Sequence, residues 1–142
     1  MRNKEFAINY LNNERQKLYY QILRVYKEAT KEENIINSVE YLDSLYRAHL
    51  KAKIYIDTQK LTGADLQRQI NIREDNLERI CNAVSEKTGK AYAMKIVNMY
   101  KDLADKDEDL YVIHNSNYFN KLKVINKVDA QVKNSKSDNL EK

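Results

Sequence analysis

The sequence contains no proline, and its 142 residues include only two glycines, Gly63 and Gly89. Proline breaks the interior of a helix and glycine weakens it, so a chain almost free of both can form long uninterrupted helices. Charged residues make up 32% of the chain and are spread along its length, as on the solvated faces of amphipathic helices. These features predict an all-α protein.

The first sixty residues carry apolar side chains at helical spacing in two consecutive stretches. The positions are Leu11, Leu18, Ile22, Val25 and Ala29 in residues 4–30, and Ile35, Val39, Leu42, Tyr46 and His49 in residues 31–57. Between the stretches, Thr30 and Glu33 have the spacing of a capping box, which indicates a short break and a new helix start. Residues 1–60 are therefore expected to form a long antiparallel helical hairpin, suited to dimerisation or interaction.

The second half carries shorter periodic stretches, at residues 62–70, 73–87 and 90–104, with Gly89 placed to close a helix. We expect residues 61–132 to form a compact group of shorter helices, packed with the hairpin as one domain. The polar residues 133–142 are expected to be a flexible tail.

Residues 110–125 allow two interpretations. In the first, Ser116 or Asn117 caps a helix whose apolar face carries Phe119, Leu122, Ile125, Val128 and Val132. In the second, residues 110–114 and 118–125 are the strands of a β-hairpin, which would form a wing.

The stretch "LTGADLQRQINIREDNLERICNAV", residues 61–84, resembles the Cro/repressor-type helix-turn-helix family. The matching positions are Leu61, Thr62, Leu66, the tripeptide Ile70-Asn71-Ile72, Leu77 and Ile80. The resemblance implies a turn at Asn71 and a recognition helix from Arg73 that lies in a DNA major groove. The implied DNA-binding residues are Thr62, which caps the first helix, Arg73 and Arg79, Asn76 and Asn82 as base readers, and Lys87, Lys90 and Lys95.

The function that this resemblance implies is that of a small DNA-binding regulator, or of a phage- or plasmid-type accessory protein. Its partner would be double-stranded DNA. A homodimer would present two recognition helices roughly 34 Å apart, one turn of the duplex. The net charge of +4 favours a polyanionic partner, although residues 61–105 carry seven basic and seven acidic side chains.

An alternative is a non-enzymatic α-helical protein-interaction module, such as a phage-type inhibitor or an assembly factor, acting on a protein partner. Glu74 and Asp75 favour it, because carboxylates at the start of a recognition helix repel phosphate. The chain has 11 tyrosines but only two phenylalanines and no tryptophan, and tyrosine suits half-buried interface positions. The expected interface residues are Tyr19, Tyr26, Tyr41 and Tyr46.

Other classes of function lack a signature. Cys81 is the only cysteine, and His49 and His114 have no partner at a metal-binding spacing, so we expect no enzyme, no metal and no cofactor. No apolar run approaches the ~20 residues that a membrane helix needs. We therefore expect a cytoplasmic protein without a membrane partner.

Overall fold

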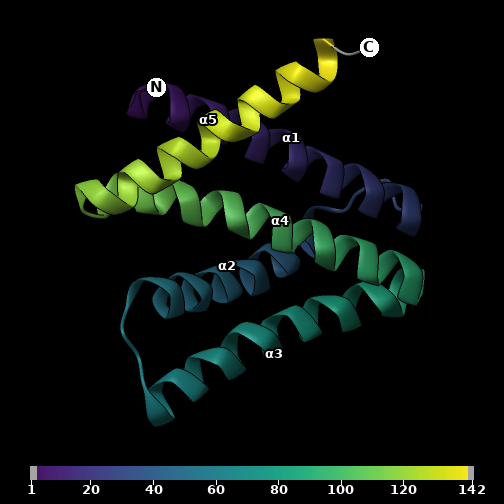
Figure 1. Cartoon of the computed structure of the whole chain (residues 1–142). Coiled ribbons are helices and arrows are strands. Elements are labelled where there is room, and N and C mark those ends of the chain that lie inside the picture. The colour runs from purple at the N-terminus through teal and green to yellow at the C-terminus, as the bar shows by residue number, and fades with distance from the viewer. Residues whose placement is uncertain (1–2, 141–142) are drawn as a thin grey trace. The chain divides into compact units, whose positions relative to one another are not determined.

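The computed structural model describes residues 3–140, which form five α-helices (Figure 1). They are α1 (Lys4–Thr30), α2 (Ile36–Thr58), α3 (Gly63–Thr88), α4 (Lys90–Asn115) and α5 (Tyr118–Leu140). No β-strand occurs in this part of the chain, so the predicted all-α class is confirmed. Each helix has between 23 and 27 residues, so the prediction that the helices after residue 60 are shorter is wrong.

The connection between α1 and α2 is longer than the capping-box spacing predicted. Lys31 leaves α1 in a left-handed conformation, with a φ of 58°. The backbone N–H of Glu32 donates to Oγ1 of Thr30 over 3.3 Å, and the N–H of Ile36 donates to Oδ1 of Asn34 over 3.1 Å. These side-chain oxygens satisfy backbone donors within the connection. As a result α2 begins at Ile36 and not near residue 31.

The turn expected at residues 70–72 is absent, because α3 is continuous from Gly63 to Thr88. Asn71 lies in the helix interior, where its Oδ1 accepts a hydrogen bond of 2.9 Å from Nε2 of Gln67, one helical turn earlier. Asparagine tolerates a left-handed turn but does not require one. One straight helix therefore replaces the expected helix-turn-helix-like unit.

Four of the five apolar residues that suggested two short helices lie on one side of this straight helix, whereas the fifth, Ile72, lines an open hollow. Leu66, Ile70, Leu77, Ile80 and Val84 are separated by four, seven, three and four residues, which is the spacing of a heptad seam. The last three are buried. Leu66, Ile70, Leu77 and Ile80 thus fit a bent unit and a straight one, and burial against α2 decides for the straight helix.

Glycines mark both ends of α3. Thr62 occupies the N-cap position as expected, but its side chain makes no capping hydrogen bond, and Gly63 follows it with a φ of 58°. At the other end Gly89 has a φ of 92°, and its N–H donates to the carbonyl of Ser85. The role predicted for Gly89 is confirmed, since a positive φ there is accessible to glycine without steric cost.

The helical interpretation of residues 110–125 is correct, and the β-hairpin wing is not formed. α4 continues to Asn115, well beyond residue 104. Oδ1 of Asn117 accepts a hydrogen bond of 3.0 Å from the N–H of Asn120, which caps the start of α5. Phe119, expected on the apolar face of this helix, is instead 63% exposed.

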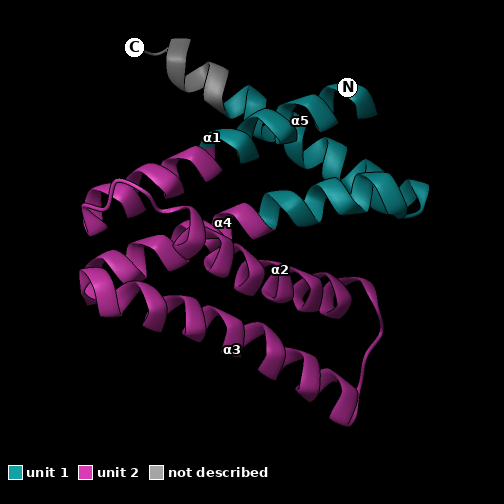
Figure 2. Cartoon of the chain, turned by 180° about the vertical axis from the view of Figure 1, so that it is seen from behind, with its two compact units in different colours: residues 1–17, 105–142 teal, residues 18–104 magenta. Residues whose placement is uncertain are grey.

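The chain divides into two compact units (Figure 2). Unit 1 combines residues 1–17 with 105–142, and unit 2 comprises residues 18–104. α1 and α4 each contribute a segment to both units. α2 and α3, on either side of residue 60, pack against each other within unit 2.

Each unit has its own apolar core. That of unit 1 contains Ala7, Leu11, Ile113, Val124, Ile125, Val128 and Val132. That of unit 2 contains Ile22, Tyr26, Val39, Leu42, Leu45, Tyr46, Ile80, Val84, Ala93, Ile96, Tyr100, Leu103 and Ala104. Residues 133–140, expected in a flexible tail, continue α5 to Leu140, and residues 141–142 lie outside the described residues.

None of the helices in residues 3–140 combines the length and the apolar content that crossing a bilayer requires.

If α3 is straight, alanine at position 71 should give a more stable protein than glycine, whereas a turn at residues 70–72 would give the opposite order. Inside a helix alanine is more favourable than glycine by about 1 kcal/mol, whereas a left-handed turn prefers glycine. The free energy of unfolding, measured with urea, should therefore be higher by about 1 kcal/mol for Asn71→Ala than for Asn71→Gly. The same pair of substitutions at Asn82, exposed on α3, is the matched control and should differ by a similar amount. Greater stability of Asn71→Gly would contradict the straight helix.

Candidate interaction surfaces

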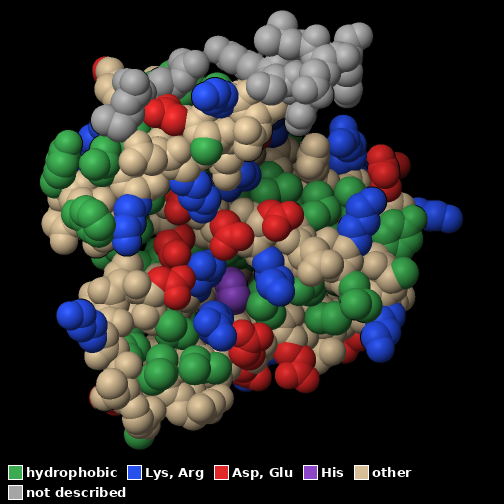
Figure 3. All heavy atoms as spheres, in the orientation of Figure 1, with side chains coloured by type: hydrophobic (Ala, Val, Ile, Leu, Met, Phe, Trp, Pro, Cys, Tyr) green, Lys and Arg blue, Asp and Glu red, His purple; other side chains and the backbone are tan. Residues whose placement is uncertain are grey.

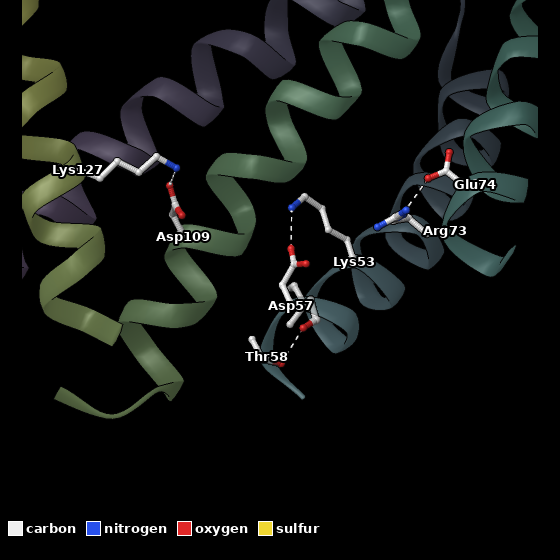
Figure 4. A network of polar contacts seen from close by, with 8 residues as sticks. Lys53, Asp57, Thr58, Arg73, Glu74, Asp109 and Lys127 are labelled. Atoms are coloured by element: carbon white, nitrogen blue, oxygen red, sulfur yellow. Dashed lines mark hydrogen bonds and ion pairs between the residues drawn. The ribbon is translucent and has the colours of Figure 1, made fainter. Parts of the chain in front are cut away.

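The two arginines expected to contact DNA both lie on α3, and both are ion-paired with acidic residues of the same helix. Nε of Arg73 is 2.8 Å from Oε1 of Glu74, and Figure 4 shows the two side chains directed toward each other. Nε of Arg79 is 3.0 Å from Oδ2 of Asp75, one helical turn away. Glu74 and Asp75, whose carboxylates argue against DNA binding, thus neutralise the two arginines that were expected to contact DNA.

The remaining residues of the expected DNA-binding set are either hydrogen-bonded within the protein or exposed. Nδ2 of Asn76 donates to the carbonyl of Ile72 over 2.8 Å, so the amide is engaged with its own helix. Lys87 donates to Oε1 of Glu32 over 3.1 Å, and this hydrogen bond raises the pKa of Lys87. Thr62, Asn82, Lys90 and Lys95 are exposed.

The outer side of α3 has a slight acidic excess. Residues 63–88 contain four basic side chains (Arg68, Arg73, Arg79 and Lys87) and five acidic ones (Asp65, Glu74, Asp75, Glu78 and Glu86), a net charge of −1. An open hollow on this helix is lined by Asn71, Ile72, Glu74, Asp75 and Glu78. On the face drawn in Figure 3, basic and acidic side chains are intermixed. Phosphate binding needs local cationic surface, which α3 does not offer.

Two of the four tyrosines expected at an interface are part of the core of unit 2. Tyr26 is 2% exposed and Tyr46 is 5% exposed, so neither is accessible to a partner. Their spacing on the apolar seams of α1 and α2 explains this burial. A third, Tyr19, is half-buried and donates from its hydroxyl to Oδ2 of Asp43 over 2.5 Å. Only Tyr41 of the four is exposed.

Asp43 joins three helices of unit 2 through its carboxylate. Oδ2 accepts from Tyr19 on α1, and Oδ1 accepts over 3.1 Å from the hydroxyl of Tyr100 on α4. The ring of Tyr100 also lies 5.2 Å from that of Tyr46. Burial, and then the neighbouring carboxylate, raise the pKa of Tyr100 well above its ordinary value. The neutral hydroxyl is therefore a permanent donor to Asp43, which makes this cluster a structural clamp.

The outward face of α2 carries a stripe that sequence reasoning did not single out as a unit. Tyr41, Ala48 and Tyr55 are each seven residues apart, which places them along one side of the helix. Ser44 and Lys51 fill the intervening turns and are exposed. Tyr41 and Tyr55 are 53% and 47% exposed, respectively. We call these five residues the α2 stripe; their seven-residue spacing was the signal that could have identified them.

His49 lies on the buried side of α2, where it contacts α3. Nδ1 of His49 is 2.9 Å from the backbone carbonyl of Arg73, and because a carbonyl can only accept, Nδ1 carries the proton. Burial lowers the pKa of His49, and the hydrogen bond to Arg73 and the Glu74 carboxylate only partly oppose this effect. His49 thus binds α2 to the middle of α3 in its neutral form.

No group of three or more histidine, cysteine, aspartate or glutamate side chains in residues 3–140 is arranged to hold a metal ion. Comparison with protein-family models, with curated proteins and with solved structures found no match to this chain.

The neutral His49 predicts a loss of stability in mild acid. Its pKa is below the ordinary value of about 6.5 in the folded protein, so below that pH the unfolded chain takes up a proton first. The free energy of unfolding should fall as pH decreases from about 6.5 through the folded pKa, by at most about 1.4 kcal/mol per pH unit. Urea titrations at several pH values measure this slope. His49→Gln should flatten it and His114→Gln, at an exposed position, should not; equal slopes for the parent and His49→Gln would contradict the assignment.

Proposed function

We propose that this chain is a non-enzymatic helical protein-interaction module whose working surface is the α2 stripe. The observation that carries the proposal is the exposure of Tyr41 and Tyr55 on a helix whose other face is held in the core by Val39 and Leu42. Tyrosine combines a large apolar ring with a polar tip, and it is enriched among the residues that anchor protein interfaces.

The geometry of the stripe suits a helix as the partner's contacting element. Tyr41 and Tyr55 are 14 residues apart, or about 21 Å along the helix axis at 1.5 Å per residue. The small side chains of Ser44 and Ala48 lie between them, so a second helix can approach the backbone there while the two rings pack on either side. A second copy of the chain, as in the expected homodimer, or another protein can supply that helix, as an inhibitor or assembly factor requires.

The stripe is also held rigidly, which lowers the entropic cost of binding. α2 packs along α3, and His49 and Asp43 fix it to α3, α1 and α4 through hydrogen bonds. Lys53 is paired with Asp57 over 3.0 Å beside the end of the stripe (Figure 4). Partner binding therefore does not have to order this helix.

A charged side chain in the middle of the stripe should abolish partner binding. Ala48→Arg places a long cation where close helix approach is needed, and we expect the affinity to fall at least about tenfold. Sedimentation equilibrium measures self-association, and retention of partners from an extract of the source cells on the immobilised protein measures hetero-association. Ala130→Arg, at an exposed position of α5, is the control, and because Ala48 is half-buried, circular dichroism of both variants must show the helix content of the parent. Equal binding by the parent and Ala48→Arg in both measurements would overturn the proposal.

Duplex DNA is the competing partner, favoured by the overall charge of +4 and opposed by the ion pairs of α3. Fluorescence anisotropy with a random-sequence duplex at low and moderate salt separates the two. A protein that contacts about six phosphates loses about 10³-fold in affinity between these conditions, whereas we expect weak binding and a shallow dependence. Tight, salt-sensitive binding that is lost in the Arg73→Ala, Arg79→Ala variant would replace the interaction module with a DNA-binding protein.

A further inference from the structure

Two adjacent aromatic side chains at the start of α5 have the highest exposed fractions among the exposed large apolar residues of the described chain. Tyr118 is 77% exposed and Phe119 is 63% exposed. Tyr111, near the end of α4, is also exposed. Figure 2 shows the turn between α4 and α5 at one end of unit 1. We call Tyr111, Tyr118, Phe119, Lys121 and Lys123 the aromatic corner.

The corner is built on an ordered turn. The N–H of Ser116 donates to the carbonyl of Val112 over 3.0 Å, and Nδ2 of Asn115 donates to the carbonyl of Tyr111 over the same distance. Asn117 caps α5, so Tyr118 and Phe119 are its first two residues. The backbone that carries the two rings is thus held by hydrogen bonds, and both rings are exposed.

The charged side chains that follow Tyr111 along the chain, as far as residue 123, are all basic. Residues 110–123 contain no aspartate or glutamate, but they contain Lys121, Lys123 and His114. Nζ of Lys123 lies 4.7 Å from the centre of the Phe119 ring, a cation–π contact that places positive charge directly at the aromatic surface. The nearest acidic residue along the chain, Asp109, is paired with Lys127 over 2.8 Å (Figure 4).

We propose that the aromatic corner binds the surface of a bilayer that contains anionic lipids. Aromatic rings partition into the headgroup region of a membrane, and lysines beside them attract anionic headgroups. A bilayer deforms around outward-pointing rings, whereas a protein partner must provide a matching pocket for each. A single strand of nucleic acid needs a basic groove that follows its backbone, and two lysines within one turn of α5 do not form one.

This contact is independent of the α2 stripe, which belongs to unit 2. Binding of the aromatic corner to a membrane surface is also compatible with the sequence, although a membrane partner was not predicted from it. That expectation came from the lack of a spanning segment, and binding at the surface of a bilayer does not require one.

Sedimentation with vesicles tests the corner. Vesicles of phosphatidylcholine with phosphatidylglycerol should retain the full chain at low salt, and vesicles of phosphatidylcholine alone should retain much less. Lys121→Gln with Lys123→Gln should weaken partitioning by about 25-fold, because each lysine near an anionic surface contributes about fivefold. Tyr118→Ser with Phe119→Ser should also reduce it. Tyr20→Ser, at a residue of α1 that is 59% exposed, is the matched control and should bind like the parent.

Three outcomes would overturn the proposal. One is equal retention by the two kinds of vesicle, or retention by neither. Another is a loss in the corner variants no greater than in Tyr20→Ser. The third is a change in oligomeric state of the corner variants without lipid, measured by sedimentation velocity, which would assign the corner to contact between copies. Ala48→Arg should bind vesicles like the parent. The proposal for the α2 stripe and the proposal for the aromatic corner can therefore be refuted independently of each other.

Discussion

The burial of one side of α3 against α2 is the constraint on which unit 2 depends. Leu77, Ile80 and Val84 occupy successive turns of α3 and are removed from water by the packed helices. Burying a large aliphatic side chain contributes about 1.5–3 kcal/mol, so three of them outweigh any local preference of Asn71 for a turn. The N-terminal half of α3 continues the same seam with Leu66 and Ile70, and the helix has no reason to bend.

Polar contacts give this apolar packing a single arrangement. Asp43 accepts hydrogen bonds from Tyr19 and Tyr100, and His49 donates to the carbonyl of Arg73. A helix that rotated or slid by one turn would leave these buried and half-buried groups without partners, at a cost of about 1–3 kcal/mol for each. The apolar seam therefore brings α1, α2, α3 and α4 together, and the hydrogen bonds select their register.

The sequence predicted well the features that depend on local chemistry. The near absence of proline and glycine predicted helices, Gly89 ends α3 with a positive φ, and Asn117 caps α5. Each follows from the conformational preference of one or two residues. The straight course of α3 was missed because the apolar spacing of residues 66–80 fits both a bent and a straight element. Only the packing partner, α2, distinguishes them, and periodicity does not reveal which element that is.

The candidate surfaces were harder to predict, because exposure depends on which face of a helix meets its neighbours. Tyr26 and Tyr46 lie on the buried faces of α1 and α2, whereas Tyr41 lies on the outer side of α2. All three are tyrosines on amphipathic helices, so residue type alone cannot rank them. Phe119 illustrates the same limit: its spacing from Leu122 and Ile125 fits the core face, but it lies at the first turn of α5, beyond the reach of the core.

The two exposed surfaces are not equivalent in physical terms. A tyrosine on the α2 stripe keeps its hydroxyl hydrated, so its exposure costs little in the free protein. The side chain of Phe119 has no polar group, and its exposed part has an apolar area on the order of 100 Å². Burying this area would contribute about 2.5 kcal/mol of hydrophobic free energy. Lys123 covers one face of that ring and recovers only part of this free energy. The rest of this free energy is gained only when the Phe119 ring enters an apolar environment. Phe119 in the aromatic corner therefore has a larger driving force for binding than a tyrosine of the α2 stripe, whereas the α2 stripe offers the longer contact surface.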